Sequence, residues 1–177
     1  MQEHILFTLN DNFEGAELKP QWKFFDGHDI SRFHVLDNSL VIKAKGNSVG
    51  DCSPLICIPY HHSYIAQVEL NIEGDAIGGI VLFYNSNAYS GILADNENIL
   101  DNLRGWQFPT EKNVIKDHIF LRLKNINNTV DMFYSLDGER WIKIENSAEV
   151  SCYNHNVKRI FKFTNRSLLY WKRDSQV

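Results

Sequence analysis

The sequence has no excess of basic residues and no long apolar run, and both absences exclude classes of partner. It carries 18 Lys and Arg against 22 Asp and Glu, for a net charge of −4 and a pI of about 5.9. A nucleic acid or an anionic membrane surface needs a basic patch, so neither is an expected partner. No run of about 18 apolar residues occurs, so no membrane-spanning segment is predicted.

Cysteine is also scarce, and its pattern argues against a disulfide framework. The three residues are Cys52, Cys57 and Cys152, an odd number without regular spacing. The interval between Cys52 and Cys57 differs from that of a CxxC redox or zinc pair. Glu3 stands where a signal peptide has basic residues, and the apolar run that follows is short. We therefore expect reduced thiols, no export signal and a cytoplasmic protein.

No apolar stripe with helical spacing is present, and the hydrophobic period is two almost throughout. Tyr64–Ile72 alternates between apolar and polar residues, and Gly78–Tyr84 is a continuous apolar run typical of a central strand covered on both faces. Asp37-Asn38, Asn127-Asn128 and Asp137-Gly138 lie between apolar runs and are predicted as two-residue hairpin turns.

The spacing of these segments predicts one all-β domain. The first expected strand is Ile5–Leu9, and strands separated by Asx and Gly turns follow along the chain. No linker, repeat or low-complexity segment divides the 177 residues, which are enough to bury a core. We predict a single domain over residues 1–177, folded as a two-sheet antiparallel β-sandwich or jelly roll.

Several short motifs carry a family resemblance. In chain order they are Asp11-Asn12-Phe13-Glu14-Gly15 with Leu18 and Trp22, Ser31-Arg32-Phe33, Ser53-Pro54-Leu55, Gly78–Tyr84, Tyr89-Ser90-Gly91, Tyr134–Gly138 and Tyr153-Asn154-His155-Asn156. Together, from about Phe7 to Asn156, they closely resemble the C-terminal β-sandwich of the family 43 glycoside hydrolases, the β-xylosidases and α-arabinofuranosidases. The resemblance implies a concanavalin A-like jelly roll that is not itself catalytic. In the family this sandwich packs on a five-bladed propeller that holds the catalytic carboxylates, and the propeller is absent from this chain.

The C-terminal end departs from the family pattern. Val157–Phe163 places basic residues where the family has a Phe-Gly-Gly-Phe-like loop, and the chain ends soon after Trp171. We expect residues of about 157–177 to be diverged or truncated and the closing strand of the family to be missing. A neighbouring strand would then have an unpaired edge, and a homodimer is one way to cover it.

A polar and aromatic set of residues is the candidate carbohydrate-binding surface. Its members are Tyr84, Tyr89, Trp106, Tyr153, Asn154 and His155. Flat aromatic rings stack on the apolar faces of sugars, and amides pair with hydroxyl groups. The alternative is structural, with Tyr84 and Tyr153 packed in or near the core and the polar residues fixing a loop.

Glu69 and Glu73 are the candidate catalytic pair. In a strand, residues i, i+2 and i+4 share a face, and glucanases with related folds place three acidic residues in this way. Here Asn71 takes the middle position, and an amide cannot shift its neighbours' pKa values by like-charge repulsion. The alternative is a solvated outer face opposite a core of apolar residues.

Asp11, Asn12 and Glu14 are the candidate ligands of a structural calcium ion, because carboxylate and amide oxygens suit this cation. His61-His62 is not expected to bind a metal, because adjacent strand residues point to opposite faces. No other cofactor is expected.

These expectations combine into one functional hypothesis with two alternatives. The favoured one is a non-catalytic accessory module that contacts xylan- or arabinan-derived sugars or a partner glycosidase domain. The first alternative is a glycoside hydrolase that acts through Glu69 and Glu73. The second is a structural interaction module without sugar binding.

Overall fold

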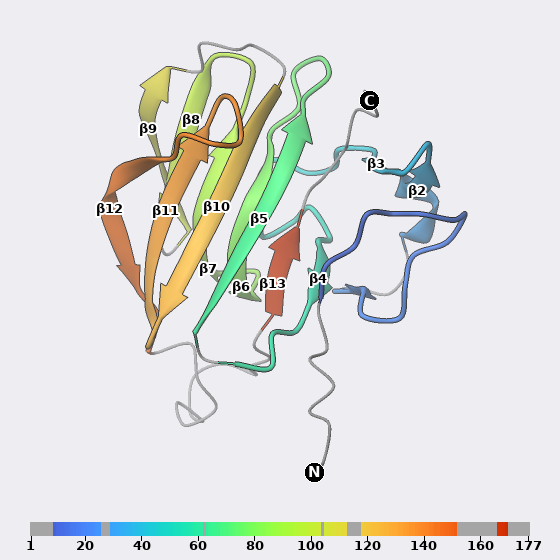
Figure 1. Cartoon of the computed structure of the whole chain (residues 1–177), viewed down its shortest axis with the longest axis horizontal. Coiled ribbons are helices and arrows are strands. Elements are labelled where there is room, and N and C mark those ends of the chain that lie inside the picture. Colours follow the sequence, from blue (N-terminus) through green and yellow to red (C-terminus); the bar gives the residue numbers. More distant parts are fainter. Residues whose placement is uncertain are drawn as a thin grey trace.

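Two antiparallel sheets face each other in the computed structural model, which describes residues 9–25, 29–61, 63–103, 105–112, 118–151 and 166–169 (Figure 1). The larger sheet has the order β1-β4-β13-β6-β7-β8-β9, and the smaller has the order β12-β11-β10-β5. The predicted two-sheet antiparallel β-sandwich is therefore confirmed.

The larger sheet consists of seven strands among the described residues. They are β1 (Lys23–Phe24), β4 (Leu55–Cys57), β13 (Arg166–Leu169), β6 (Gly78–Asn85), β7 (Ala88–Ala94), β8 (Asn98–Leu103) and β9 (Trp106–Lys112). Residues 78–84 of β6 are all buried, as expected for a central strand covered on both faces.

The smaller sheet consists of β5 (Tyr64–Asn71), β10 (His118–Ile126), β11 (Thr129–Ser135) and β12 (Ile142–Glu149). β10 alternates between buried and more exposed residues along its length, so one face lies in the core and the other faces outward. A two-stranded hairpin, β2 (Phe33–Leu36) and β3 (Ser39–Ile42), and a short 3-10 helix, η1 (Ile30–Arg32), lie beside the sandwich.

Three apolar clusters hold these layers together. The largest joins inward-facing residues of both sheets, such as Ile80, Ile92, Leu121 and Met132. The second lies on the other face of the larger sheet, where Val49 and the ring of Phe25 cover residues that include Phe83. This second face is therefore packed by the chain's own residues rather than open to solvent.

The turn predictions are right in two cases and wrong in length in the third. Asp37-Asn38 and Asn127-Asn128 have positive φ angles and form two-residue turns between paired strands. The hairpin at Asp137-Gly138 is longer than predicted, because β11 ends at Ser135 and β12 begins at Ile142. Oδ1 of Asp137 accepts hydrogen bonds from the backbone N–H groups of Glu139 and Arg140, which stabilises the wider loop.

The C-terminal prediction is tested only in part. β13 pairs with β4 on one side and β6 on the other, so the larger sheet includes a strand from the region expected to diverge. Residues 152–165 and 170–177 lie outside the described ones, so the loss of the closing strand stays a prediction. Among the described strands, β5 pairs only with β10, so β5 forms one edge of the smaller sheet.

Candidate functional site

The two candidate catalytic acids do not form a pair on one strand. Oε1 of Glu69 lies 2.9 Å from Nε2 of His118 on the neighbouring strand β10. β5 ends at Asn71, so Glu73 lies beyond the strand and is exposed. Residues i and i+4 share a face only when both lie in the same strand. Because Glu73 lies outside β5, Glu69 and Glu73 do not meet this condition.

The predicted sugar-contacting residues are distributed over different parts of the molecule. Tyr84 is 2% exposed in the core between the sheets, and Tyr89 is 6% exposed beneath the covering cluster on the other face. Neither ring has a face open to a ligand in this structure. Tyr153, Asn154 and His155 lie outside the described residues.

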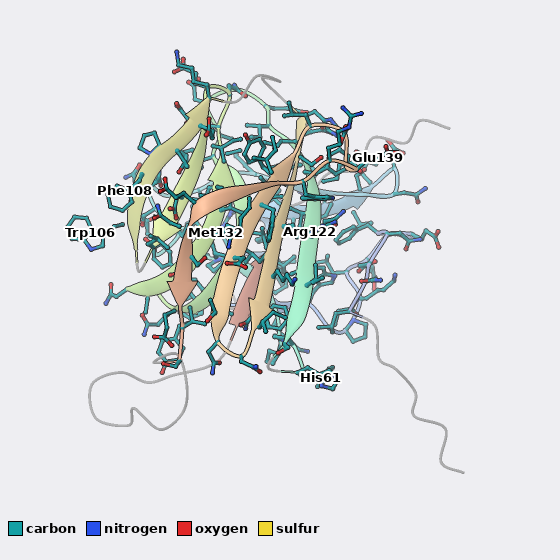
Figure 2. The ribbon with its side chains drawn as sticks, turned by 60° about the vertical axis from the view of Figure 1, so that its left-hand side comes forward. His61, Trp106, Phe108, Arg122, Met132 and Glu139 are labelled. Carbon is teal, nitrogen blue, oxygen red and sulfur yellow. The ribbon has the colours of Figure 1, made fainter. Side chains whose placement is uncertain are left out.

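Among the described members of this set, Trp106 is the one open to solvent, and it has an aromatic neighbour that sequence reasoning missed. Trp106 is 73% exposed and Phe108 is 49% exposed, two residues apart on the edge strand β9. Figure 2 shows both rings at the outer margin of β9, directed away from the sandwich. We call these two residues the β9 aromatic pair. The signal in the sequence was the alternation Trp106-Gln107-Phe108 ahead of a proline.

The register of β9 explains why the pair is exposed. Phe108 lies opposite Asp101 of β8, and Asp101 accepts a 2.8 Å hydrogen bond at Oδ2 from Nδ2 of Asn146 in the opposing sheet. The β9 aromatic pair therefore lies on the face of the larger sheet that is turned toward the smaller sheet. The smaller sheet ends at β12, which lies against β8. Among the described strands none extends far enough to cover the rings on β9.

Asp101 itself is a second feature that the sequence did not reveal. Its side chain is fully buried between the sheets, and Oδ1 has no hydrogen-bond partner among the described residues. Burial raises the pKa of this carboxyl above its usual range, and the hydrogen bond from Asn146 opposes this only in part. A buried carboxyl with one unmet oxygen favours the protonated form.

The outer face of the smaller sheet carries an ordered cation. The guanidinium carbon of Arg122 lies 3.5 Å from the ring centroid of Trp141, and its Nε and Nη2 donate to Oε1 of Gln67 at 3.1 and 2.7 Å. Arg122 projects from β10, in the middle of the sheet (Figure 2). Stacking on one side and a bidentate contact on the other fix the position of this charge.

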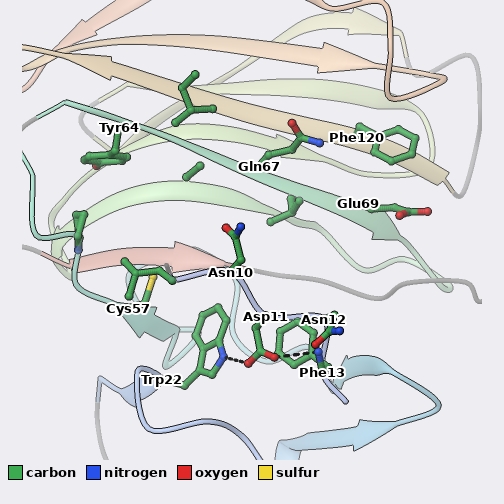
Figure 3. Close-up of a pocket in the computed structure, with 15 residues that line it drawn as sticks. Asn10, Asp11, Asn12, Phe13, Trp22, Cys57, Tyr64, Gln67, Glu69 and Phe120 are labelled. Atoms are coloured by element: carbon green, nitrogen blue, oxygen red, sulfur yellow. Dashed lines mark hydrogen bonds between the residues drawn. The ribbon is translucent and has the colours of Figure 1, made fainter. Parts of the chain in front are cut away.

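The candidate calcium ligands already have protein partners. Asp11 accepts from the indole Nε1 of Trp22 at 2.7 Å and from the backbone N–H of Phe13 at 2.9 Å (Figure 3), and Nζ of Lys19 lies 2.7 Å from Oδ1. Nδ2 of Asn12 donates to Oε1 of Glu14 at 2.5 Å. A calcium ion would have to displace Lys19, so the calcium site stays a prediction that this geometry does not favour.

No group of three or more His, Cys, Asp or Glu residues within the described ranges is arranged to hold a metal ion. No helix in the described part of the chain is long and apolar enough to cross a membrane.

A groove of about 590 Å³ lies beside β5, the last strand in the order of the smaller sheet. One wall is formed by consecutive residues of β5 from Tyr64 to Glu69, and the opposite wall by Leu9–Phe13 together with Trp22 (Figure 3). Cys57, Pro59 and Phe120 of β10 also line the groove. Sequence reasoning did not predict this groove.

The comparisons with known proteins agree with the fold and the motifs. The family model of the β-xylosidase C-terminal concanavalin A-like domain matches residues 10–164. The chain therefore belongs to this family of β-sandwich domains. No curated protein matches the chain.

Solved structures of family 43 glycoside hydrolases share the fold. The BlXynB protein of Bacillus licheniformis is 19% identical with a TM-score of 0.72, and a point mutant of it is 21% identical with a TM-score of 0.74. The GH43B protein of a Bacteroides ovatus xyloglucan PUL is 13% identical with a TM-score of 0.68. In all three the match covers 89% of this chain but only 34% to 37% of the other. The chain thus spans about a third of the length of these proteins.

Proposed function

We propose that this protein is a non-catalytic accessory sandwich that docks on the catalytic domain of a family 43 glycosidase. The single observation that carries the proposal is the partial coverage. The sandwich accounts for only 34% of the BlXynB chain, so in that protein the fold is part of a longer polypeptide. The arrangement of the candidate acids supports a non-catalytic role, because Glu69 is paired with His118 and Glu73 lies beyond β5.

The β9 aromatic pair is the docking surface that we assign to this role. Large exposed aromatic side chains on an edge strand are favourable anchors at protein interfaces, where Trp is enriched among the residues that dominate affinity. The pair lies outside the area that the smaller sheet covers, so a partner can reach both rings without disturbing the core.

The test is binding between this chain and a separately expressed catalytic domain of a family 43 β-xylosidase from the same genome. Titration calorimetry should give a Kd below about 10 μM, and Trp106→Ala should weaken it by about tenfold or more. Tyr60→Ala is the matched control, because Tyr60 is also an aromatic residue with 73% exposure and lies outside β9. Absence of binding at about 100 μM, or equal effects of the two variants, would refute the docking role.

Sugar binding is the second candidate function, and the open ring of Trp106 is the observation that favours it. Xylo- and arabino-oligosaccharides would be titrated while Trp fluorescence is recorded for the wild type and for Trp106→Phe. A saturable change in the wild type that is reduced in the variant would support sugar contact. Constant fluorescence up to about 10 mM sugar would exclude affinities of biological interest.

A further inference from the structure

The outer face of the smaller sheet, on the side away from the core, carries more apolar side chains than a solvated sheet face usually does. β10 buries alternate residues and turns the others outward. When one face of an antiparallel sheet packs on the core, the other face is normally polar. Here Ile65 is 61% exposed and Ile126 is 47% exposed at outward positions. The half-buried rings of Phe120, Phe133 and Trp141 lie on the same face. Apolar groups gathered on an exposed face mark interaction sites.

Arg122 is an ordered cation in the middle of this outer face. Trp141 and Gln67 hold its guanidinium group in place, so little side-chain freedom would be lost on binding. None of the ion pairs among the described residues includes Arg122. Arg and Trp are also enriched among the residues that dominate protein interfaces. We therefore expect the guanidinium group to pair with a carboxylate of another molecule.

Glu145 is an acid on the same outer face. Ile144 of β12 is buried in the core cluster between the sheets, and Glu145 follows it as an exposed residue. Successive strand residues point to opposite faces, so Glu145 points outward, as does Lys143, which pairs with Asp131. None of the ion pairs in the described part of the chain includes Glu145. The outer face thus offers both a cation and an acid for contact with another molecule.

The strand register gives the height of these charges along the sheet. Phe133 of β11 lies opposite Arg122 of β10 and opposite Lys143 of β12, so these two residues lie at the same height. Lys124 is two positions beyond Arg122, and Glu145 is two positions beyond Lys143 in the same direction. The register shift along β12 places Glu145 between the heights of the two cations. β10 and β12 therefore carry opposite charges at matching heights, on either side of β11.

A two-fold axis along β11 would match these charges between two copies of the chain. If two copies stack through their outer faces about this axis, β10 of each copy lies over β12 of the other. Heights along the strands stay the same, so Arg122 and Lys124 of one copy face Glu145 of the other, and this contact occurs twice. Stacked sheets lie about 10 Å apart, which an arginine and a glutamate that extend toward each other can bridge.

We propose that this protein forms a two-fold symmetric dimer through the outer face of the smaller sheet, in which Arg122 of each copy pairs with Glu145 of the other. The dimer also covers the exposed apolar side chains of that face. Four strands of about eight residues span about 19 Å by about 26 Å, so each copy contributes about 500 Å² of flat area. A standard interface buries about 800 Å² per partner, so we expect a weak dimer.

This dimer differs from the one expected from the sequence, because it uses the outer face of the strands rather than an edge. It also does not depend on the proposed function. The β9 aromatic pair belongs to the larger sheet and lies on the face turned toward the smaller sheet, whereas the dimer uses the opposite side of the smaller sheet. The docking test and the dimer test therefore have separate readouts.

The test is sedimentation equilibrium of the full chain from about 2 to about 200 μM. The average mass should rise with concentration toward twice the 20.6 kDa of a single chain, with a Kd of about 100 μM or below. Glu145→Arg should weaken the dimer by about tenfold or more, because it places like charges opposite each other. Arg122→Glu should do the same, and the double variant should return the Kd to within about fivefold of the wild type.

Glu97→Arg is the matched control, because it makes the same charge change at an exposed residue between β7 and β8 of the larger sheet. It should change the Kd by less than about twofold. Near-UV circular dichroism checks the fold of each variant, and Glu145→Arg alone decides the test if Arg122→Glu does not fold. A monomer up to about 200 μM, or equal effects of Glu145→Arg and Glu97→Arg, would overturn the proposal. The first of these results would leave the outer face to a different protein with an acidic surface.

Discussion

The indole Nε1 of Trp22 donates a 2.7 Å hydrogen bond to Oδ2 of Asp11, a carboxylate whose side chain is only 2% exposed. The same carboxylate accepts the N–H of Phe13, whose φ is +52°, and lies 2.7 Å from the ammonium of Lys19. Asp11 thus connects the start of the described chain to the Trp22 loop and fixes one wall of the β5 groove. Asp11, one of the candidate calcium ligands, is thus the centre of this set of hydrogen bonds.

Replacement of Asp11 should therefore destabilise the protein. Asp11→Ala removes the carboxylate that accepts from the buried indole N–H of Trp22 and from the backbone N–H of Phe13, at a cost of about 2–3 kcal/mol in the free energy of unfolding. Urea denaturation measures this. Glu14→Ala is the control, since Glu14 is exposed three residues away, and it should stay within about 0.5 kcal/mol of the wild type. Equal effects of the two variants would contradict the structural role of Asp11.

Arg122 and Trp141 should be energetically coupled. The guanidinium is stacked on the indole and held by Gln67, so a double-mutant cycle with Arg122→Ala and Trp141→Ala should give a coupling energy of about 1 kcal/mol. Arg122→Lys should recover little of it, because an ammonium lacks the planar fork. Additive single-mutant effects in the same denaturation series would show that the stacked pair contributes nothing.

Asp101 should make the protein less stable as the pH rises from acid to neutral. Burial raises the pKa of Asp101 in the folded state above its value in the unfolded chain. Below the ordinary carboxyl pKa, Asp101 is protonated in both states and its contribution to the free energy of unfolding is fully present. That contribution is lost as the pH rises through the folded-state pKa. Asp101→Asn removes the ionisation and should stabilise the protein at about pH 7 by on the order of 1 kcal/mol, with a smaller gain near pH 4.

Asp131 provides a control of opposite sign for Asp101. Its carboxylate is held by Lys143 and Ser147, and these hydrogen bonds lower its pKa. Asp131→Asn should therefore cost stability near neutral pH, by about 0.5 kcal/mol for a partly exposed pair, and the difference should disappear on acidification. If the two variants shift stability in the same direction, the account of Asp101 fails.

The sequence predicted the sandwich well because its signals are local. The buried run Gly78–Tyr84 and the Asn127-Asn128 turn are each set by neighbouring residues, and the structure places them as expected. The longer loop at Asp137-Gly138 was missed because side-chain acceptors, not backbone propensity, set its length.

The candidate site was less predictable because it depends on which strands lie at sheet edges. Nothing in the order of residues states that Tyr89 is covered by a distant cluster while Trp106 projects from β9. The Asp101–Asn146 contact joins residues 45 positions apart, and the Arg122–Gln67 contact joins residues 55 apart. Alternation assigns a side chain to a face, but only the topology shows whether that face is open.

Cys57 provides the prediction for alkaline pH. It is 4% exposed on β4 beside the groove, and burial raises its pKa from 9.0 to about 11. The unfolded chain therefore loses this thiol proton at lower pH than the folded protein does. The contribution of the Cys57 thiol to the free energy of unfolding is therefore fully present below about pH 9. It is lost as the pH rises to about 11, by at most about 3 kcal/mol.

The test compares the wild type with Cys57→Val, in which this position has no thiol to titrate. As the pH rises across this range, the free energy of unfolding of the wild type should fall relative to that of the variant. Urea denaturation under reducing conditions at about pH 8 and about pH 10.5 measures it. Parallel losses in both proteins would show that the thiol remains in contact with solvent, and that the wall formed by Cys57 is not closed.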